Sequence, residues 1–137
     1  MPKRRRGARS AVLQPLRRHR RFEELVDAAL ARIPPPFDRA LDEVAVVIED
    51  EPDARQRLEN ELGPDDTLYG LYEGVPRTEW GADSSPVPNK ISLFRLPLEE
   101  DFPDPRELAA QVRHTVVHEL AHHLGIGDER LDELGVD

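Results

Sequence analysis

The chain has 137 residues, of which 38% are hydrophobic and 5% aromatic, so it has the size of one domain with a small aliphatic core. It contains no cysteine, which excludes disulfides and thiolate metal sites, so a metal ion would have to be held by histidine, aspartate or glutamate. No apolar run is long enough to span a bilayer, and no apolar stretch follows the basic N-terminus as in a secretory signal. We therefore expect a cytoplasmic, monomeric protein without membrane contact.

The net charge of −9 conceals an uneven distribution along the chain. Residues 1–21 carry nine lysines or arginines and no acid, whereas residues 22–137 carry ten basic and 28 acidic side chains, a net charge of −18. We expect residues 1–21 to be a disordered, solvated tail, because they are too charged to bury an apolar face. Residues 22–137 are then the folded domain. Binding of nucleic acid through the tail is the alternative use of this charge.

The first half of the chain predicts two helices and two strands. Apolar residues recur at helical spacing from about residue 20 to residue 32, and three prolines at 34–36 end that helix. Residues 44–48 form a continuous apolar, β-branched run, which is typical of a strand covered on both faces. Residues 52–62 predict a second helix and residues 68–72 a second strand. This succession favours a right-handed parallel crossover between the two strands.

The second half predicts loops, one further strand and a long helix. Residues 73–89 are rich in glycine and proline and predict a long loop. Apolar and polar side chains alternate sufficiently over residues 90–96 to predict a third strand. The prolines in 97–103 predict another loop. A helix then follows, with Asp104 as its N-cap and Gly125 as the left-handed residue that ends it.

The predicted long helix carries one polar strip on an otherwise apolar surface. The apolar arc consists of Leu108, Ala109, Val112, Val116, Val117, Leu120, Ala121 and Leu124. The polar strip consists of Gln111, Thr115, His118, Glu119 and His122. Such a helix is typical of a rigid platform for a metal site. His123 points about 100° away from His122, into the apolar arc, so we expect it to be packed there or to support the metal-site residues without binding the metal.

The residues from His118 to His122 have the pattern H-E-x-x-H. Residues four apart on a helix lie about 40° apart around its axis, so His118 and His122 can bind one ion. Glu119 is placed to accept a proton from a water activated by the metal. Gly125 lets the chain reverse after the helix and bring Asp128 toward the ion as a third ligand. Asp128 also precedes a short helix predicted at 129–134, so an N-cap is its alternative role.

Other polar side chains are weaker candidates for the site. His114 lies one turn before the histidine pair but near the edge of the apolar arc, and we do not expect it to be a ligand. Tyr69, Tyr72 and Trp80 could donate to an oxyanion or line a pocket, but we expect each of them to pack in the core or in loops.

The segment from His118 to Asp128 matches H-E-x-x-H-x-x-G-x-x-D, an aspartate version of the metzincin zinc motif. Together with residues 68–76, 88–94 and 112–134, this segment makes the sequence resemble the small bacterial zincin-like metallopeptidases, or minimal metzincins. The resemblance covers roughly residues 22–135. It implies an α+β, zincin-like fold, in which a small mixed sheet of three to four strands packs against an active-site helix and two or three further helices.

The resemblance also implies a hydrolase site with one Zn²⁺. His118, His122 and Asp128 would be the metal ligands, and Glu119 the general base. The chain departs from the metzincin pattern in one respect, because metzincins place a methionine turn beneath the metal and the only methionine here is Met1.

Two hypotheses follow for the function. The first is a zinc-dependent metalloendopeptidase that hydrolyses peptide bonds in a peptide or protein substrate, paired as an extended strand against an exposed sheet edge near residues 90–96. The alternative is a non-catalytic binding protein on a zincin scaffold, with a basic tail that binds nucleic acid. The uneven charge and the missing methionine turn motivate this alternative.

Overall fold

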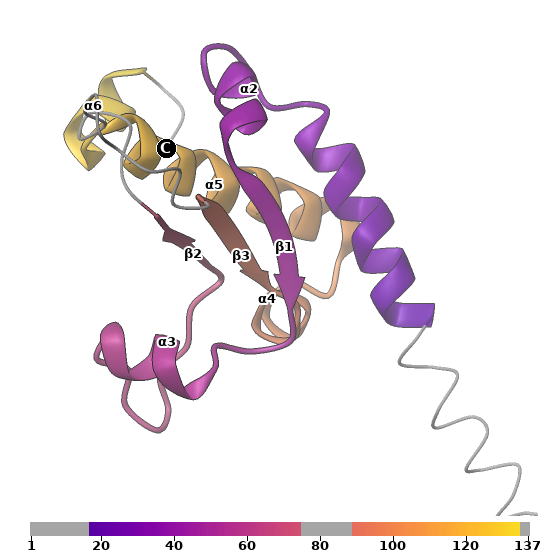
Figure 1. Ribbon diagram of the computed structural model, residues 1–137. Coiled ribbons are helices and arrows are strands. Elements are labelled where there is room, and N and C mark those ends of the chain that lie inside the picture. The colour runs from indigo at the N-terminus through magenta and orange to yellow at the C-terminus, as the bar shows by residue number, and fades with distance from the viewer. Residues whose placement is uncertain (1–16, 75–88, 135–137) are drawn as a thin grey trace, which may run out of the picture.

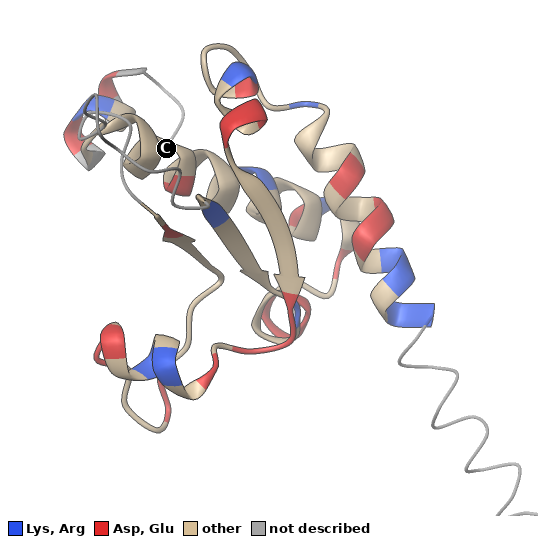
Figure 2. Cartoon of the chain, viewed as in Figure 1, with Lys and Arg blue, Asp and Glu red and all other residues tan. Residues whose placement is uncertain are grey.

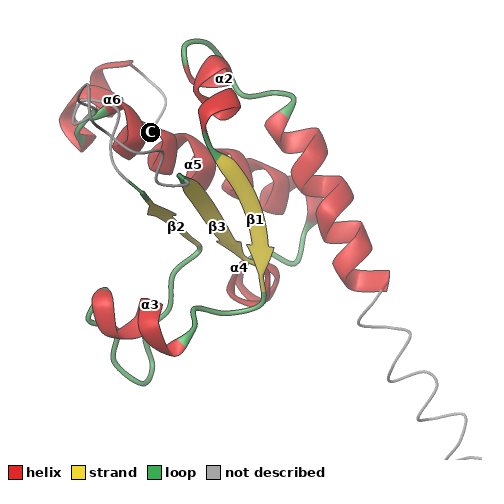
Figure 3. Ribbon diagram, viewed as in Figure 1, coloured by secondary structure: helices red, strands yellow, loops and turns green. Residues whose placement is uncertain are grey.

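The computed structural model describes residues 17–74 and 89–134 (Figure 1). Residues 17–30 are helical. The elements that follow are α2 (Phe37–Ala40), η1 (Leu41–Glu43), β1 (Ala45–Glu49), α3 (Ala54–Glu59), β2 (Gly70–Glu73), β3 (Lys90–Phe94), α4 (Arg95–Asp101), α5 (Pro105–Leu124) and α6 (Asp128–Leu134) (Figure 3). The predicted α+β class is therefore confirmed.

The three strands form one mixed sheet in the order β1-β3-β2. β1 pairs in parallel with β3, with Val46 opposite Ile91, and β2 pairs antiparallel with β3, with Tyr72 opposite Ile91. The predicted parallel crossover from the first strand to the second is therefore wrong, because β3 lies between them and β2 runs the opposite way. Strand succession along the chain indicated a crossover, but it could not reveal a third strand inserted into the sheet.

Burial along the strands also differs from the prediction. β1 is an edge strand with no fully buried residue, so the expectation that residues 44–48 are covered on both faces is wrong. The strand buried on both faces is β3, in which Ile91, Ser92, Leu93 and Phe94 are all buried. Because β3 has neighbours on both sides, residues 90–96 are also not the exposed sheet edge that the sequence suggested for a peptide.

Residues 97–103, predicted as a loop, belong largely to helix α4, which follows β3 without a connecting loop. Arg95 begins this helix and is buried, and its guanidinium pairs with Asp50 at 2.9 Å and Glu99 at 2.6 Å. Pro97 lies in the first turn of α4, where a missing N–H costs nothing. Pro97 therefore lies at a helix start rather than in a loop, whereas Pro103 follows the end of the helix.

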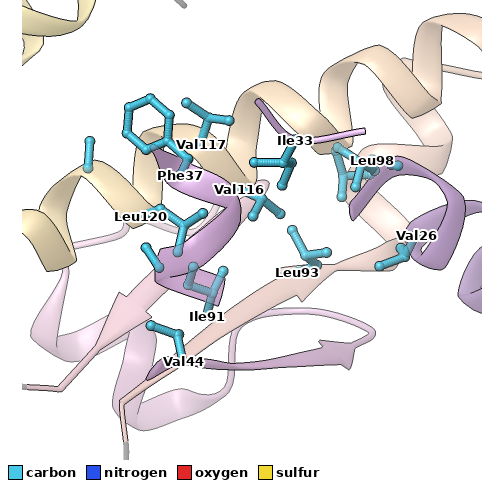
Figure 4. Packing of buried hydrophobic residues seen from close by; sticks show 14 of the residues in the cluster. Val26, Ile33, Phe37, Val44, Ile91, Leu93, Leu98, Val116, Val117 and Leu120 are labelled. Carbon is cyan, nitrogen blue, oxygen red and sulfur yellow. The ribbon is translucent and has the colours of Figure 1, made fainter. Parts of the chain in front are cut away.

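One hydrophobic core lies between the sheet and the helices on one of its faces (Figure 4). Ile91 and Leu93 of β3 point into it and are fully buried. α5 contributes Val112, Val116 and Leu120, all with no exposed surface, and the first helix contributes Phe22, Val26 and Ala29. The predicted apolar arc of the long helix is therefore the face that covers the sheet.

Helix α3 is held by polar contacts rather than by the core. Leu58 of this helix is 82% exposed. Gln56 is instead fully buried, takes part in a capping box with Asp53, and donates from Nε2 to Glu73 at 2.9 Å. This bond ties α3 to the end of β2.

The expected boundary between tail and domain, after residue 21, falls inside the first described helix. Residues 17–21, assigned to the tail from their charge, are already helical. The predicted loop at 73–89 lies mostly outside the described residues, as does Trp80. No helix in the described ranges combines the length and the apolar character needed to cross a bilayer.

Candidate active site

Helix α5 carries the candidate site and is bounded as the sequence predicted. The side chain of Asp104 accepts a hydrogen bond from the N–H of Arg106 at 2.8 Å, and Pro105 occupies the first helical position. Gly125 has a left-handed backbone, with φ 73°, and Ile126 donates its N–H to the carbonyl of Ala121. These contacts fix where α5 begins and ends, and the packing of its apolar arc in the core decides where the polar strip faces.

His118, Glu119 and His122 come together on one side of α5. The rings of His118 and His122 have centroids 5.2 Å apart. Nδ1 of His122 lies 3.0 Å from Oε2 of Glu119, which is an ion-pair distance. The side chain of His122 is 49% exposed and that of Glu119 only 11%, so the site opens to solvent on the histidine side.

Glu119 is buried between α5 and strand β2. Its carboxylate accepts a hydrogen bond from the backbone N–H of Tyr72. Burial raises the pKa of Glu119 to about 7, and the bond from Tyr72 partly opposes this shift. Oε2 is buried and makes no hydrogen bond of good geometry within the described part of the chain. The carboxyl group therefore titrates near neutral pH and has unused acceptor capacity.

An open cleft of about 310 Å³ lies beside Glu119 and His118. Its other lining residues are Leu68, Tyr69 and Gly70, at and just before the start of β2, and Gln111, His114 and Thr115 of α5. β2 approaches α5 closely at Gly70, where an added Cβ would lie 2.6 Å from Cγ2 of Thr115. The cleft is therefore bounded by the strand on one side and by the polar strip on the other.

Two polar-strip residues and His114 have definite places in this cleft. Gln111 donates from Nε2 to Oγ1 of Thr115 at 3.1 Å, so both side chains line the cleft rather than extend into solvent. His114 is exposed, and its ring stacks on His118 with a centroid distance of 6.3 Å. His114 is thus a wall of the cleft, one turn before the histidine pair.

Asp128 begins helix α6, and its side chain lies outside the described part of the structure. The predicted short helix starts one residue earlier than expected, and Gly127 accepts the first backbone bond, from Leu131 at 3.1 Å. Gly127 thus occupies the position that the sequence offered to Asp128 as an N-cap. Among the described side chains, no group of three or more His, Asp or Glu is arranged as a metal site.

His123 is completely buried, as its position in the apolar arc predicted. The sequence did not predict its partners. Nε2 of His123 lies 2.9 Å from Oε2 of Glu43, and Nδ1 shares a hydrogen bond of 3.0 Å with the hydroxyl of Tyr72. Glu43 is 80 residues away in the sequence, and no local pattern signals such a contact.

Residues 41–136 match the profile of a family described as zincin-like metallopeptidase. The chain belongs to the zincin-like metallopeptidase family. The match contains the whole of the sheet, α5 and α6, and it confirms the family indicated by the H-E-x-x-H motif. A comparison with curated proteins found no match.

Proposed function

We propose that this zincin-like protein is a zinc-dependent peptidase that cleaves an extended peptide in the cleft between β2 and α5. The observation that carries the proposal is the buried carboxylate of Glu119, which lies beside the paired rings of His118 and His122. We assign His118, His122 and Asp128 as metal ligands and Glu119 as the general base.

The described residues fit a divalent ion of the zinc type. Two imidazoles four residues apart on one helix are a common pair of zinc ligands, and the absence of cysteine leaves only nitrogen and oxygen donors. The buried Oε2 of Glu119 also lacks a hydrogen bond of good geometry from any described residue, so a proton carried by a water molecule would satisfy it.

The chemistry is metal-assisted hydrolysis. Zn²⁺ held by these ligands would activate a water molecule and polarise the carbonyl of the scissile bond. Glu119 accepts the proton of the attacking water and then delivers it to the leaving amine. Burial against β2 keeps the carboxylate in a fixed orientation.

The open edge of β2 suits an extended substrate. The N–H of Phe94 donates to the carbonyl of Tyr69, so in the antiparallel ladder the backbone groups of Leu71 and Glu73 face β3. The backbone groups of Gly70 and the carbonyl of Tyr72 then face away from β3 and remain for a peptide, while the N–H of Tyr72, on the same side, is bonded to Glu119. A peptide added along this edge would pass the general base.

Metal content and hydrolysis, measured on the same variants, test this proposal. Protein purified without chelator is expected to contain about one zinc per chain, and Glu119→Gln should retain it, because the ligands are untouched. Hydrolysis of a mixed peptide library should decrease by about 10²- to 10⁴-fold in Glu119→Gln, the usual contribution of a general base. His118→Ala should lose the zinc.

His114→Gln is the matched control for metal binding, because it changes a histidine on the same face of α5 one turn away. It is expected to retain the zinc. Absence of zinc uptake at micromolar concentration, or full hydrolysis by Glu119→Gln, would contradict the proposal.

A further inference from the structure

A chain of partly buried hydrogen bonds joins four segments of the protein behind the candidate site. His123 on α5 has no exposed surface, and both of its ring nitrogens have partners. Nε2 contacts the carboxylate of Glu43 in η1, and Nδ1 contacts the hydroxyl of Tyr72 in β2. The Tyr72 hydroxyl also donates to Oδ1 of Asn89 at 3.0 Å, just before β3 begins.

Tyr72 connects this chain to the general base. Its hydroxyl bonds to His123 on one side, and its backbone N–H bonds to the carboxylate of Glu119 on the other. Glu119 and His123 are one helical turn apart on α5, so strand and helix are joined at two points by a single residue of β2. A shift of Tyr72 would therefore move the donor that orients Glu119.

Strand β2 needs such an attachment. It has only four residues, and within the described sheet it pairs on one side alone, with β3. It also approaches α5 closely at Gly70, where the strand has no side chain to hold it. Short edge strands open more readily than central ones, because few buried contacts and hydrogen bonds hold them.

We propose that His123 is a positioning residue, which holds β2 against α5 through Tyr72 while it is itself fixed by Glu43. The inference rests on the proposed function in one respect, since the group that it orients is the proposed general base. The holding of the strand itself does not depend on catalysis or on metal.

Amide hydrogen exchange of the full chain, measured by NMR, tests the proposal directly. Tyr72→Phe removes only the hydroxyl and keeps the ring that packs near His123, with a centroid distance of 5.6 Å. We expect exchange at the residue 72 amide to accelerate about five- to tenfold, the factor for a net hydrogen bond. The amides of Leu71 and Glu73, which face β3, should change much less.

Tyr69→Phe is the matched control, because it also removes a tyrosine hydroxyl near β2, in this case one that bonds to Asp101. It should leave exchange at residue 72 unchanged. Glu43 is at the other end of this series of hydrogen bonds. Glu43→Gln retains an acceptor for His123, so its exchange rate at residue 72 should match that of the wild type. Glu43→Ala should accelerate exchange there as Tyr72→Phe does.

The exchange result separates this inference from the proposed function. Equal acceleration across β2 and α5 in Tyr72→Phe, or no acceleration at residue 72, would overturn it whether or not the protein hydrolyses peptides. If exchange changes as expected but Glu119→Gln retains hydrolysis, the positioning role of His123 stands and the general-base assignment fails. For an active enzyme, Tyr72→Phe should lower kcat while the zinc content stays constant.

Discussion

Neighbouring histidines on α5 lie in very different environments. His122 and His123 are neighbours in the sequence, yet the first has a side chain that is 49% exposed and the second is fully buried. A rotation of about 100° between consecutive helical residues separates the two environments. The helical wheel alone therefore predicted which of the two histidines is exposed and which is packed.

Gly70 offers a prediction at the same scale. A methyl group there would lie 2.6 Å from Cγ2 of Thr115, so Gly70→Ala must push β2 away from α5. We expect the free energy of unfolding to decrease by about 1–3 kcal/mol, as for other overpacked sites. Urea denaturation of the metal-free protein measures this loss.

Thr115→Ser provides the matched background for Gly70→Ala. It deletes the crowded methyl group but keeps the hydroxyl that accepts from Gln111. The double variant should recover part of the loss, giving a non-additive cycle. An identical loss in both backgrounds would show that the crowding lies elsewhere, for example at the carbonyl of Ser92.

At the scale of elements, α5 could be predicted almost entirely and the sheet only in part. The helix has a clear period, an N-cap and a glycine end, which are all local signals. Strand pairing is not local, so β3 was predicted as a strand but not as the central one. The same holds for the site, because His118, Glu119 and His122 lie within one motif, whereas the contacts of Tyr72 with Glu119 and His123 join segments about 50 residues apart.

The connection between α3 and β2 predicts a pH dependence of stability. Glu73 pairs with Arg55 at 2.7 Å and accepts from Gln56, and the bond from Arg55 holds the pKa of Glu73 below its usual value of 4.5. A lowered carboxyl pKa stabilises the fold above the unfolded-state value, and this stability is lost as the pH decreases through the folded-state value. Glu73→Gln should therefore destabilise the protein by about 1 kcal/mol at pH 7 and much less well below pH 4.5.

Glu59→Gln is the control for this effect, since Glu59 pairs with the same arginine at 2.8 Å but is 57% exposed. It should change the thermal midpoint very little at either pH. A loss for Glu73→Gln that is the same in acid and at pH 7 would exclude the ion pair as its cause.

Gly125 controls the turn from α5 to α6. Its left-handed backbone is open to glycine and tolerable for asparagine, but it strains alanine. We expect Gly125→Ala to lower the free energy of unfolding by about 1 kcal/mol and Gly125→Asn to lower it less. Equal losses in chemical denaturation would show that the backbone conformation is not the cause.

At the scale of the whole molecule, the uneven charge motivates a prediction that nothing above tests: the basic N-terminal end binds nucleic acid. Four of its arginines lie at the free end of the first helix, visible in blue in Figure 2, and the other five basic residues precede the described part. On the alternative hypothesis, a short DNA duplex should bind at low salt, with an affinity that decreases steeply as salt is added. Deletion of residues 1–16 should weaken binding, and His118→Ala should not. Absence of binding at low salt would contradict the prediction.

The first helix has a consequence for where the molecule can be cut. The family match begins at residue 41, but the core also contains Phe22, Val26, Ala29, Ile33, Phe37 and Ala40, all of which precede it. A shortened protein that starts at the match would keep every residue of the proposed site while exposing the apolar surface that these side chains cover. Because that surface would be exposed, we expect such a fragment to aggregate. The boundary of sequence similarity and the boundary of the folding unit are thus different places in this chain.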